Sequence, residues 1–104
     1  MKKSDFKLKI SPLAENDLHQ IIDYIAIELS NPAAAIEQIN DFEKAFENIC
    51  IFPESCPYIS NQYVRDKSLR KLIVNNYLIF YRVEGYEIQV IRVLYRMRNY
   101  ETLL

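Results

Sequence analysis

Residues 69–104 read LRKLIVNNYLIFYRVEGYEIQVIRVLYRMRNYETLL, and they carry the clearest indication of the fold. They contain three runs of branched and aromatic residues of the kind that form β-strands: Leu69–Val74, Tyr77–Val83 and Tyr86–Tyr95. The pairs Asn75-Asn76 and Glu84-Gly85 separate these runs, and such pairs are typical of two-residue hairpin turns. The stretch therefore predicts a three-stranded antiparallel meander.

The residues before this stretch predict one further strand and two helices. Residues 6–10 (FKLKI) alternate apolar and basic side chains, which is typical of a half-buried strand. Ser11-Pro12 and Asn31-Pro32 each place a capping side chain before a proline at the first helical position. Apolar residues at helical spacing follow each cap, and we expect both stripes to lie in the core. These are Leu18, Ile21, Ile22, Ile25 and Leu29 in the first helix, and Ile36, Ile39, Phe42, Phe46 and Ile49 in the second.

The two helices must form an antiparallel hairpin, because only Ser30 and Asn31 separate them. Pro53 ends the second helix, and the polar residues 53–66 predict an ordered surface loop. The resulting order β-α-α-β-β-β predicts an α+β fold in which the helical hairpin packs on one face of an antiparallel sheet. We expect residues 1–104 to form a single domain and the opposite face of the sheet to be free for a function.

Charge is divided unevenly along the chain, although the net charge is only −1. Residues 1–64 contain five Lys and Arg against ten Asp and Glu, whereas residues 65–104 contain eight against four. This division predicts an acidic helical half and a basic face formed by the strands and the C-terminal segment.

Composition also excludes several classes of site. A single glycine leaves no phosphate-binding loop and no dinucleotide motif. His19 is the only histidine, and Cys50 and Cys56 lack the spacing of a zinc site, so we expect neither a metal nor another cofactor. We expect both thiols to be free and His19 to lie at the surface. The longest apolar run, Tyr77–Tyr81, is too short to span a bilayer, so we expect a cytoplasmic protein without membrane contact.

Several motifs together resemble the RelE/ParE toxin superfamily, over about residues 7–104. The first is Ser11-x-x-Ala14-x-x-Asp17-Leu18-x-x-Ile21-x-x-Tyr24-Ile25, and Phe52-Pro53 fits the end of the second helix. The others are Tyr81-Arg82-Val83, Ile91-Arg92-Val93-Leu94-Tyr95-x-x-Arg98-Asn99 and the closing Leu103-Leu104. The resemblance implies the β-α-α-β-β-β fold and the toxin half of a type II toxin–antitoxin pair, which arrests growth unless a cognate antitoxin binds it.

The resemblance also implies where the antitoxin lies, namely against the helical hairpin and the sheet. The partly apolar outer surface of the helices, around Tyr24 and residues 33–35, offers a place for an antitoxin helix or for a second copy of the chain. A heterotetramer of toxin and antitoxin is one assembly that the resemblance allows.

The superfamily divides between two targets, because RelE-like members cut mRNA in the ribosomal A site and ParE-like members poison DNA gyrase. In the RelE-like pattern an arginine precedes the third strand and a tyrosine or histidine lies near the C-terminus, but this chain has Ile73 and Thr102 near those positions. Residues 81–83 and 92–99 are closer to the ParE-like pattern, although Tyr95 stands where that pattern commonly has histidine. We therefore favour DNA gyrase as the target. The alternatives are a metal-independent, ribosome-dependent endoribonuclease and an inactive relative that acts as a binding module.

The candidate functional residues follow from these hypotheses. For a nuclease the candidate catalytic residues are Arg92, Tyr95 and Arg98, because arginine can stabilise a phosphorane and tyrosine can donate a proton. The residues that we expect to bind the target are Arg70, Lys71, Arg96, Asn99 and Tyr100. Solvated charge and strand packing remain the alternative explanations for these arginines and tyrosines, and for Arg82 we favour a solvated charge.

Overall fold

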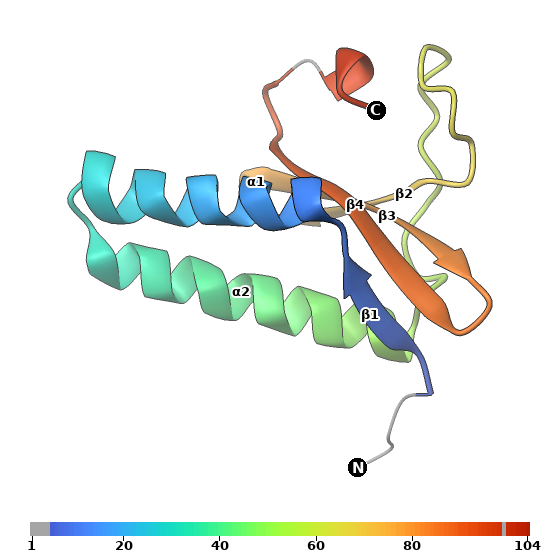
Figure 1. Ribbon diagram of the computed structural model, residues 1–104, viewed down its shortest axis with the longest axis horizontal. Coiled ribbons are helices and arrows are strands. Elements are labelled where there is room, and N and C mark those ends of the chain that lie inside the picture. Colours follow the sequence, from blue (N-terminus) through green and yellow to red (C-terminus); the bar gives the residue numbers. More distant parts are fainter. Residues whose placement is uncertain (1–4, 99) are drawn as a thin grey trace.

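The computed structural model describes residues 5–98 and 100–104 and confirms the predicted α+β order β-α-α-β-β-β (Figure 1). The N-terminal half contains β1 (Lys7–Ile10), α1 (Pro12–Asp23), a π-helical turn η1 (Tyr24–Glu28) and α2 (Pro32–Ile51). The C-terminal half contains β2 (Arg70–Val74), β3 (Tyr77–Glu84), β4 (Glu87–Tyr95) and a 3₁₀ turn η2 (Tyr100–Thr102). Among the described residues, no helix combines the length and apolar content that a membrane crossing requires.

The four strands form one sheet in the order β1-β4-β3-β2. The meander is confirmed, since β2 and β4 both pair antiparallel with β3, while β1 returns to lie parallel to β4. The first hairpin turn is Asn75-Asn76, as predicted, but the second lies one residue later than predicted. Glu84 still pairs with Glu87, so the turn residues are Gly85-Tyr86. Gly85 has a φ of +61°, a left-handed conformation that glycine adopts without a steric cost.

Both helices begin at the predicted caps. Ser11 Oγ accepts a hydrogen bond from the backbone N–H of Ala14 at 3.0 Å, and its hydroxyl donates to the carbonyl of Ile91 on β4 at 2.8 Å. Asn31 Oδ1 accepts from the backbone N–H of Ala34 at 3.1 Å. The cap of α1 therefore also ties the start of that helix to the sheet.

The main core lies between the helical hairpin and one face of the sheet. Its fully buried members from the sheet and from α2 include Ile49, Ile79, Tyr81, Ile88 and Val93. The prediction that both helical stripes are core is wrong for three residues: Leu29, Ile36 and Ile39 are 55%, 61% and 38% exposed. Figure 1 shows that the closed end of the hairpin, which contains Leu29, extends beyond the sheet. Ile39 lies farther along α2 and lines a hollow between the two helices.

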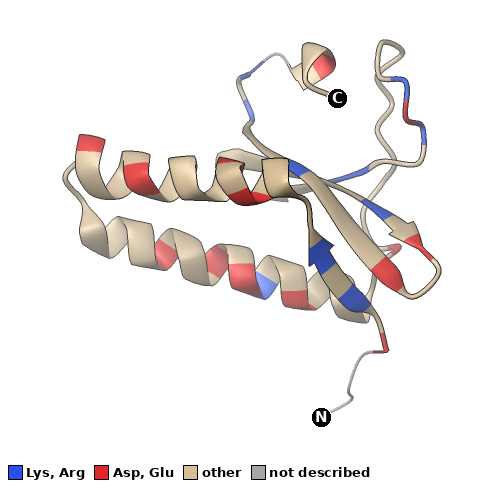
Figure 2. Ribbon diagram, viewed as in Figure 1, with Lys and Arg blue, Asp and Glu red and all other residues tan. Residues whose placement is uncertain are grey.

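The predicted separation of charge is present in the folded molecule. Figure 2 shows acidic residues along both helices and cations on the strands, on the segment after α2 and on the segment after β4. Residues 10–43 contain seven acidic residues and no Lys or Arg. The hairpin is therefore an acidic body that projects from a sheet with a mixed but more basic surface.

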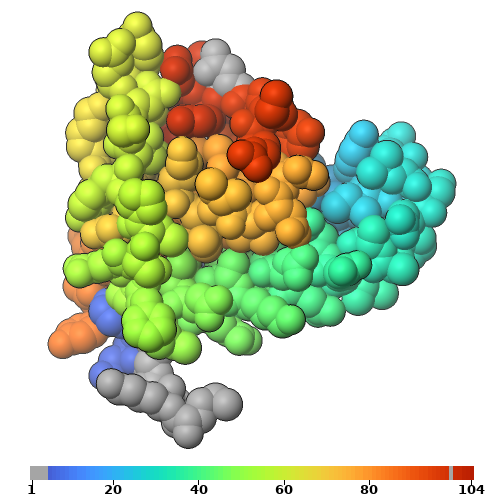
Figure 3. Space-filling model, turned by 180° about the vertical axis from the view of Figure 1, so that it is seen from behind, coloured from blue at the N-terminus to red at the C-terminus, as the bar shows by residue number. Residues whose placement is uncertain are grey.

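The opposite face of the sheet is covered, contrary to our expectation that it would be free. Ile59, Val64 and Leu69 from the segment after α2 pack with three strand residues, Leu78, Phe80 and Leu94, in a second buried cluster. Tyr100, Leu103 and Leu104 complete its edge. Figure 3 shows residues of that segment, in yellow-green, along the orange strands, with the red C-terminal segment beside them. Four consecutive residues of β3 are buried because apolar side chains cover both faces of this strand.

Candidate functional site

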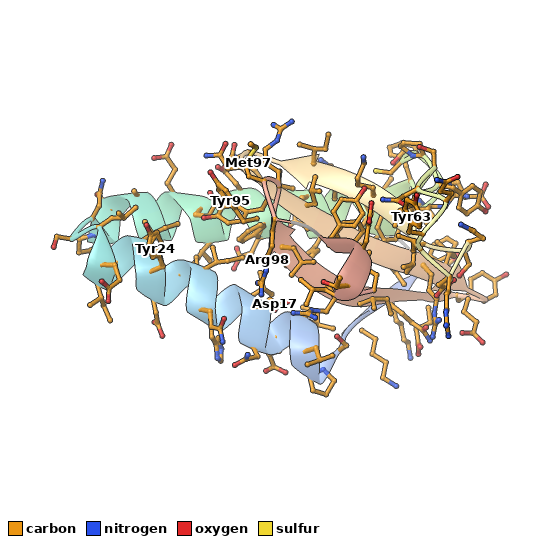
Figure 4. All side chains as sticks on the ribbon, turned by 90° about the horizontal axis from the view of Figure 1, so that it is seen from above. Asp17, Tyr24, Tyr63, Tyr95, Met97 and Arg98 are labelled. Carbon is orange, nitrogen blue, oxygen red and sulfur yellow. The ribbon has the colours of Figure 1, made fainter. Side chains whose placement is uncertain are left out.

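The site that contains predicted functional residues is a groove of about 590 Å³ between the helical hairpin and the C-terminal end of β4. In Figure 4, Asp17 and Tyr24 project from the α1 side of this groove, and Tyr95 and Arg98 lie at the end of β4. The lining residues are Asp17, Gln20, Ile21, Tyr24 and Leu29 from the hairpin, and Asn76, Tyr77, Val93, Leu94, Tyr95 and Arg98 from the sheet end. Its volume lies within the usual range of ligand pockets.

Beside the groove lies a buried ion pair between Asp17 on α1, which lines the groove, and Arg92 on β4, which does not. Arg92 Nε donates to Asp17 Oδ2 at 2.7 Å and Arg92 Nη2 donates to Asp17 Oδ1 at 2.9 Å. The backbone N–H of Val93 donates to the same carboxylate at 3.0 Å. The side chain of Arg92 is only 13% exposed and that of Asp17 only 8%. The hydrogen bonds to Asp17 raise the pKa of the Arg92 guanidinium above its ordinary value. Arg92 therefore joins α1 to β4, and the edge of its guanidinium that carries Nε and Nη2 is occupied by Asp17.

Three tyrosines gather in the groove, of which the sequence analysis proposed only Tyr95 as a catalytic candidate. The rings of Tyr77 and Tyr95 make an edge contact with their centroids 6.0 Å apart. Phe42 on α2 makes a similar edge contact with Tyr77, with the ring centroids 5.7 Å apart. Burial raises the pKa of Tyr77, and the nearby phenols of Tyr95 and Tyr24 raise it further. At neutral pH the Tyr77 hydroxyl is therefore a neutral hydrogen-bond donor, not a base.

Arg98 supplies the available positive charge of the groove. Its backbone N–H donates to the carbonyl of Tyr95 at 3.0 Å, which closes the turn after β4. Within the described part of the chain its guanidinium has no ion-pair partner. The charge of Asp17, the other charged lining residue, is already matched by Arg92. The groove therefore offers one cation and phenolic donors on an apolar base, which suits an anionic or hydrogen-bond-accepting group of a target.

The remaining predicted residues lie elsewhere. Arg96 is exposed and donates its backbone N–H to Asn76, but it does not line the groove. Tyr100 packs its ring on Phe80, with centroids 4.9 Å apart, as part of the second cluster. Asn99 lies outside the described residues. Of the predicted residues, Tyr95 and Arg98 therefore line the groove, whereas Arg92 is concealed next to it by Asp17. Arg96 and Tyr100 do not line the groove.

Arg70 and Lys71 lie on β2, the edge strand that is farthest from β1 in the sheet. Arg70 Nη1 donates to the carbonyl of Cys56 at 2.6 Å, and its guanidinium lies 4.0 Å from the ring centroid of Tyr58. Arg82, expected to be a solvated charge, is partly exposed and pairs with Asp66 at 3.1 Å. These cations belong to the surface around the segment after α2, not to the groove.

A second, smaller hollow of about 360 Å³ lies on the outer side of the hairpin, between α1 and α2. Apolar side chains such as Leu18, Ile22 and Ile39 line it, and His19, Asp23 and Glu43 stand at its polar positions. His19 is exposed, in agreement with its predicted surface position. The sequence pointed to the outer surface of the helices but did not show that exposed Ile39 would line a hollow there.

Two solved structures of toxin–antitoxin systems have this fold. A structure described as the chromosomal ParDE toxin–antitoxin system from P. aeruginosa matches with a TM-score of 0.71 and 22% sequence identity, over 86% of this chain and 95% of that chain. The toxin–antitoxin complex RelBE2 from Mycobacterium tuberculosis matches with a TM-score of 0.61 and 16% identity, over 88% of this chain and 98% of that chain. The fold is that of the RelE/ParE superfamily, as the sequence motifs predicted.

The sequence identifies the family within this class. Residues 8–100 match the family described as the ParE toxin of the type II toxin–antitoxin system parDE, and the chain belongs to this family. A comparison with curated proteins gives no match. The protein is accordingly a toxin of a type II toxin–antitoxin system.

Proposed function

We propose that this toxin arrests growth by binding DNA gyrase, and that the groove and the exposed residues after β4 contact the enzyme. The observation that carries the proposal is the Asp17–Arg92 pair. A nuclease site built from Arg92, Tyr95 and Arg98 needs Arg92 to face a phosphodiester, but its Nε and Nη2 atoms are bonded to Asp17. Breaking a buried pair of this kind to bind a phosphate costs several kcal/mol, about 3–5.

The charge distribution also supports a protein target. Proteins that grip RNA gain affinity by releasing counterions from phosphates, which requires a positively charged contact surface. The groove instead has the acidic hairpin along one side, where residues 10–43 carry no Lys or Arg. Arg98, Tyr95 and the exposed Met97 resemble the aromatic, Met and Arg residues that are enriched at protein interfaces.

The second candidate function is a metal-independent, ribosome-dependent endoribonuclease. It is favoured by one observation, namely that Tyr95 and Arg98 line the same groove. In this reaction the 2′-hydroxyl of the mRNA would lose its proton to solvent water and attack the adjacent phosphorus. The 5′-oxygen of the next nucleotide would leave, so that a 2′,3′-cyclic phosphate remains. Arg98 would stabilise the phosphorane and Tyr95 would protonate the leaving oxygen. A relative that has lost both activities would retain only antitoxin binding.

The test is induction of the toxin without its antitoxin, followed by analysis of plasmid DNA and of mRNA ends from the same cells. Gyrase inhibition predicts altered supercoiling and protein-linked double-strand breaks with intact messages. Discrete cuts within translated messages, with normal plasmid topology, would instead establish the nuclease. Unchanged growth on induction would leave only the binding-module hypothesis.

Point variants assign the effect to the groove better than truncation does. Deleting the segment after Arg96 would also remove Tyr100 and Leu104 from the second cluster, so loss of activity could reflect loss of folding. Arg98→Ala removes the available cation of the groove. Arg82→Ala is the control, because Arg82 is a partly exposed arginine that pairs with Asp66 and does not line the groove. We expect Arg98→Ala to reduce inhibition of purified gyrase and Arg82→Ala to retain it.

We further propose that the cognate antitoxin occupies the hollow between α1 and α2. The apolar lining and the acidic Asp23 and Glu43 suit an amphipathic segment whose apolar side chains are flanked by Lys or Arg. Asp23→Lys with Glu43→Lys should weaken co-purification of the antitoxin, whereas Glu15→Lys, on α1 but outside the hollow, should not. We expect a heterotetramer with two copies of each chain, which light scattering of the purified complex would measure.

A further inference from the structure

The segment between α2 and β2, residues 52–69, is an ordered part of the structure with two distinct sides. Ile59, Val64 and Leu69 point inward and are almost completely buried in the second cluster. The neighbours of these anchors face outward, and they include Tyr58, which is 57% exposed, and Tyr63, which is 68% exposed. Because the aliphatic residues supply the packing, the two rings are not required for the core.

Hydrogen bonds through Asn61 hold the backbone at Tyr63 and the side chain of Lys67. Asn61 Oδ1 accepts from the backbone N–H of Tyr63 at 2.9 Å, and Asn61 Nδ2 donates to Glu101 at 2.7 Å. Lys67 Nζ donates to the carbonyl of Asn61 at 3.1 Å, which uses one of its three N–H groups. The segment therefore presents an exposed ring and two cations, Arg65 and Lys67, on a backbone fixed at both ends.

The charge of this surface is positive, in contrast to the acidic hairpin. Residues 52–71 carry the four cations Arg65, Lys67, Arg70 and Lys71 against two acids, Glu54 and Asp66. Arg82 from β3 pairs with Asp66, which removes one of the two negative charges. In Figures 1 and 2 this surface lies at the end of the molecule away from the acidic closed end of the hairpin.

We propose that residues 58–71 form a binding surface for single-stranded nucleic acid, in which Tyr63 and Tyr58 stack on bases while Arg65 and Lys67 contact phosphates. Exposed aromatic rings beside solvent-facing cations are the combination that binds single strands without sequence preference. Arg70 already lies on one face of Tyr58, at 4.0 Å from its centroid, and so holds that ring in place for a base on its other face. The surface is separate from the groove and goes beyond the binding of gyrase itself.

The experiment is fluorescence anisotropy of labelled 12-nucleotide oligo(dT), oligo(U) and a 12-base-pair duplex with the purified full chain. We expect both single strands to bind and the duplex to bind more weakly, because its bases are not available for stacking. Tyr63→Ala should weaken binding of the single strands roughly 5- to 150-fold, the range for loss of one base stack. Arg65→Ala should lower the dependence of log affinity on log salt by about 0.7.

The matched controls are Tyr86→Ala and Lys44→Ala. Tyr86 is 72% exposed at the β3–β4 turn and Lys44 is exposed on α2, so each removes the same kind of side chain from another surface. Both variants should bind like the wild type, and circular dichroism should show that all four variants are folded. Tighter binding of oligo(U) than of oligo(dT) would identify RNA as the natural ligand, and the reverse would identify DNA.

Three results of the oligonucleotide experiment would each overturn the proposal, and a fourth comes from comparison with gyrase binding. They are an absence of single-strand binding at low salt, equal losses in the control and the test variants, and a preference for the duplex. If Tyr63→Ala and Arg65→Ala leave oligonucleotide affinity unchanged but weaken binding to gyrase, the surface is a protein interface and the proposal is wrong. Retention of gyrase binding by these variants, with loss of oligonucleotide binding, would separate the two functions.

Discussion

The Asp17–Arg92 pair offers the sharpest test of how this fold is held together. Asp17→Leu removes the carboxylate and leaves Arg92, only 13% exposed, without its partner. Removing one member of a buried pair costs about 3–5 kcal/mol, because the remaining charge stays desolvated. The backbone N–H of Val93 also loses its acceptor, which by itself costs about 1–3 kcal/mol. We therefore expect Asp17→Leu to lower the free energy of unfolding by at least about 3 kcal/mol.

The matched variant is the double substitution Asp17→Leu with Arg92→Met. It removes both charges and fills the space with apolar atoms, an exchange that is often neutral or stabilising at buried ion pairs. Only the unpaired N–H of Val93 then remains, so the double variant should lie about 1–3 kcal/mol below the wild type. It should be more stable than Asp17→Leu alone, although it carries one more substitution.

The assay is equilibrium unfolding in urea, followed by circular dichroism, for the wild type, both single variants and the double variant. The double-mutant cycle gives the coupling energy between the two side chains. A coupling energy near zero, or a cost below about 1 kcal/mol for Asp17→Leu, would refute the reasoning, since it would mean that Arg92 finds water or another partner.

Three further predictions concern other parts of the fold. Burial, followed by interactions with Cys56, raises the pKa of Tyr81, whose hydroxyl donates to the carbonyl of Pro53 at 2.9 Å. Because this pKa is higher in the folded than in the unfolded protein, its contribution to stability is complete below about pH 10 and is lost as the pH rises further. Unfolding at pH 8 and pH 11 should therefore show a fall in stability that is smaller in Tyr81→Phe. Gly85→Ala should destabilise the fold by roughly 1 kcal/mol because φ is +61° at this position, although no atom lies within 4 Å of the added methyl group. Thermal melting would measure this loss, and a stabilised variant would contradict it. Phe80→Ala should lower the free energy of unfolding in urea by about 3–5 kcal/mol, because it opens a cavity in the second cluster. Ile73→Ala, at a 53% exposed position on β2, should change it by less than about 0.5 kcal/mol. Equal losses in the two variants would contradict the assignment of that core.

The sequence predicted the elements of this fold because their signals are local. The caps at Ser11 and Asn31 and the turn at Asn75 depend on residues within three or four positions of each other. The second hairpin turn was displaced by one residue, because strand pairing extends to Glu84 and only the register of two strands decides where a turn begins. Helical periodicity identified an apolar stripe but not the length of sheet available to cover it, so Ile36 was wrongly placed in the core.

The candidate site was predicted only in part. Tyr95 and Arg98 were proposed from the charged and aromatic C-terminal segment, and the groove contains both. Asp17 belonged to a quoted motif, but its pairing with Arg92 was not foreseen, because 75 residues separate the two in the chain. Tyr77 was missed as well, since a strand tyrosine is ordinarily a packing residue and no local pattern distinguishes one that borders a groove.

The sequence alone thus determined the order of helices and strands, the family and the division of charge, all of which depend on residue identity and short-range spacing. The tertiary structure decided which charges are available. Arg92 is concealed by Asp17, Arg70 is held against Tyr58, and Arg98 is left to face the groove. It also decided that the second face of the sheet is covered. Contacts of this kind form only when distant segments dock, and their energies depend on burial and geometry, which residue identity does not specify.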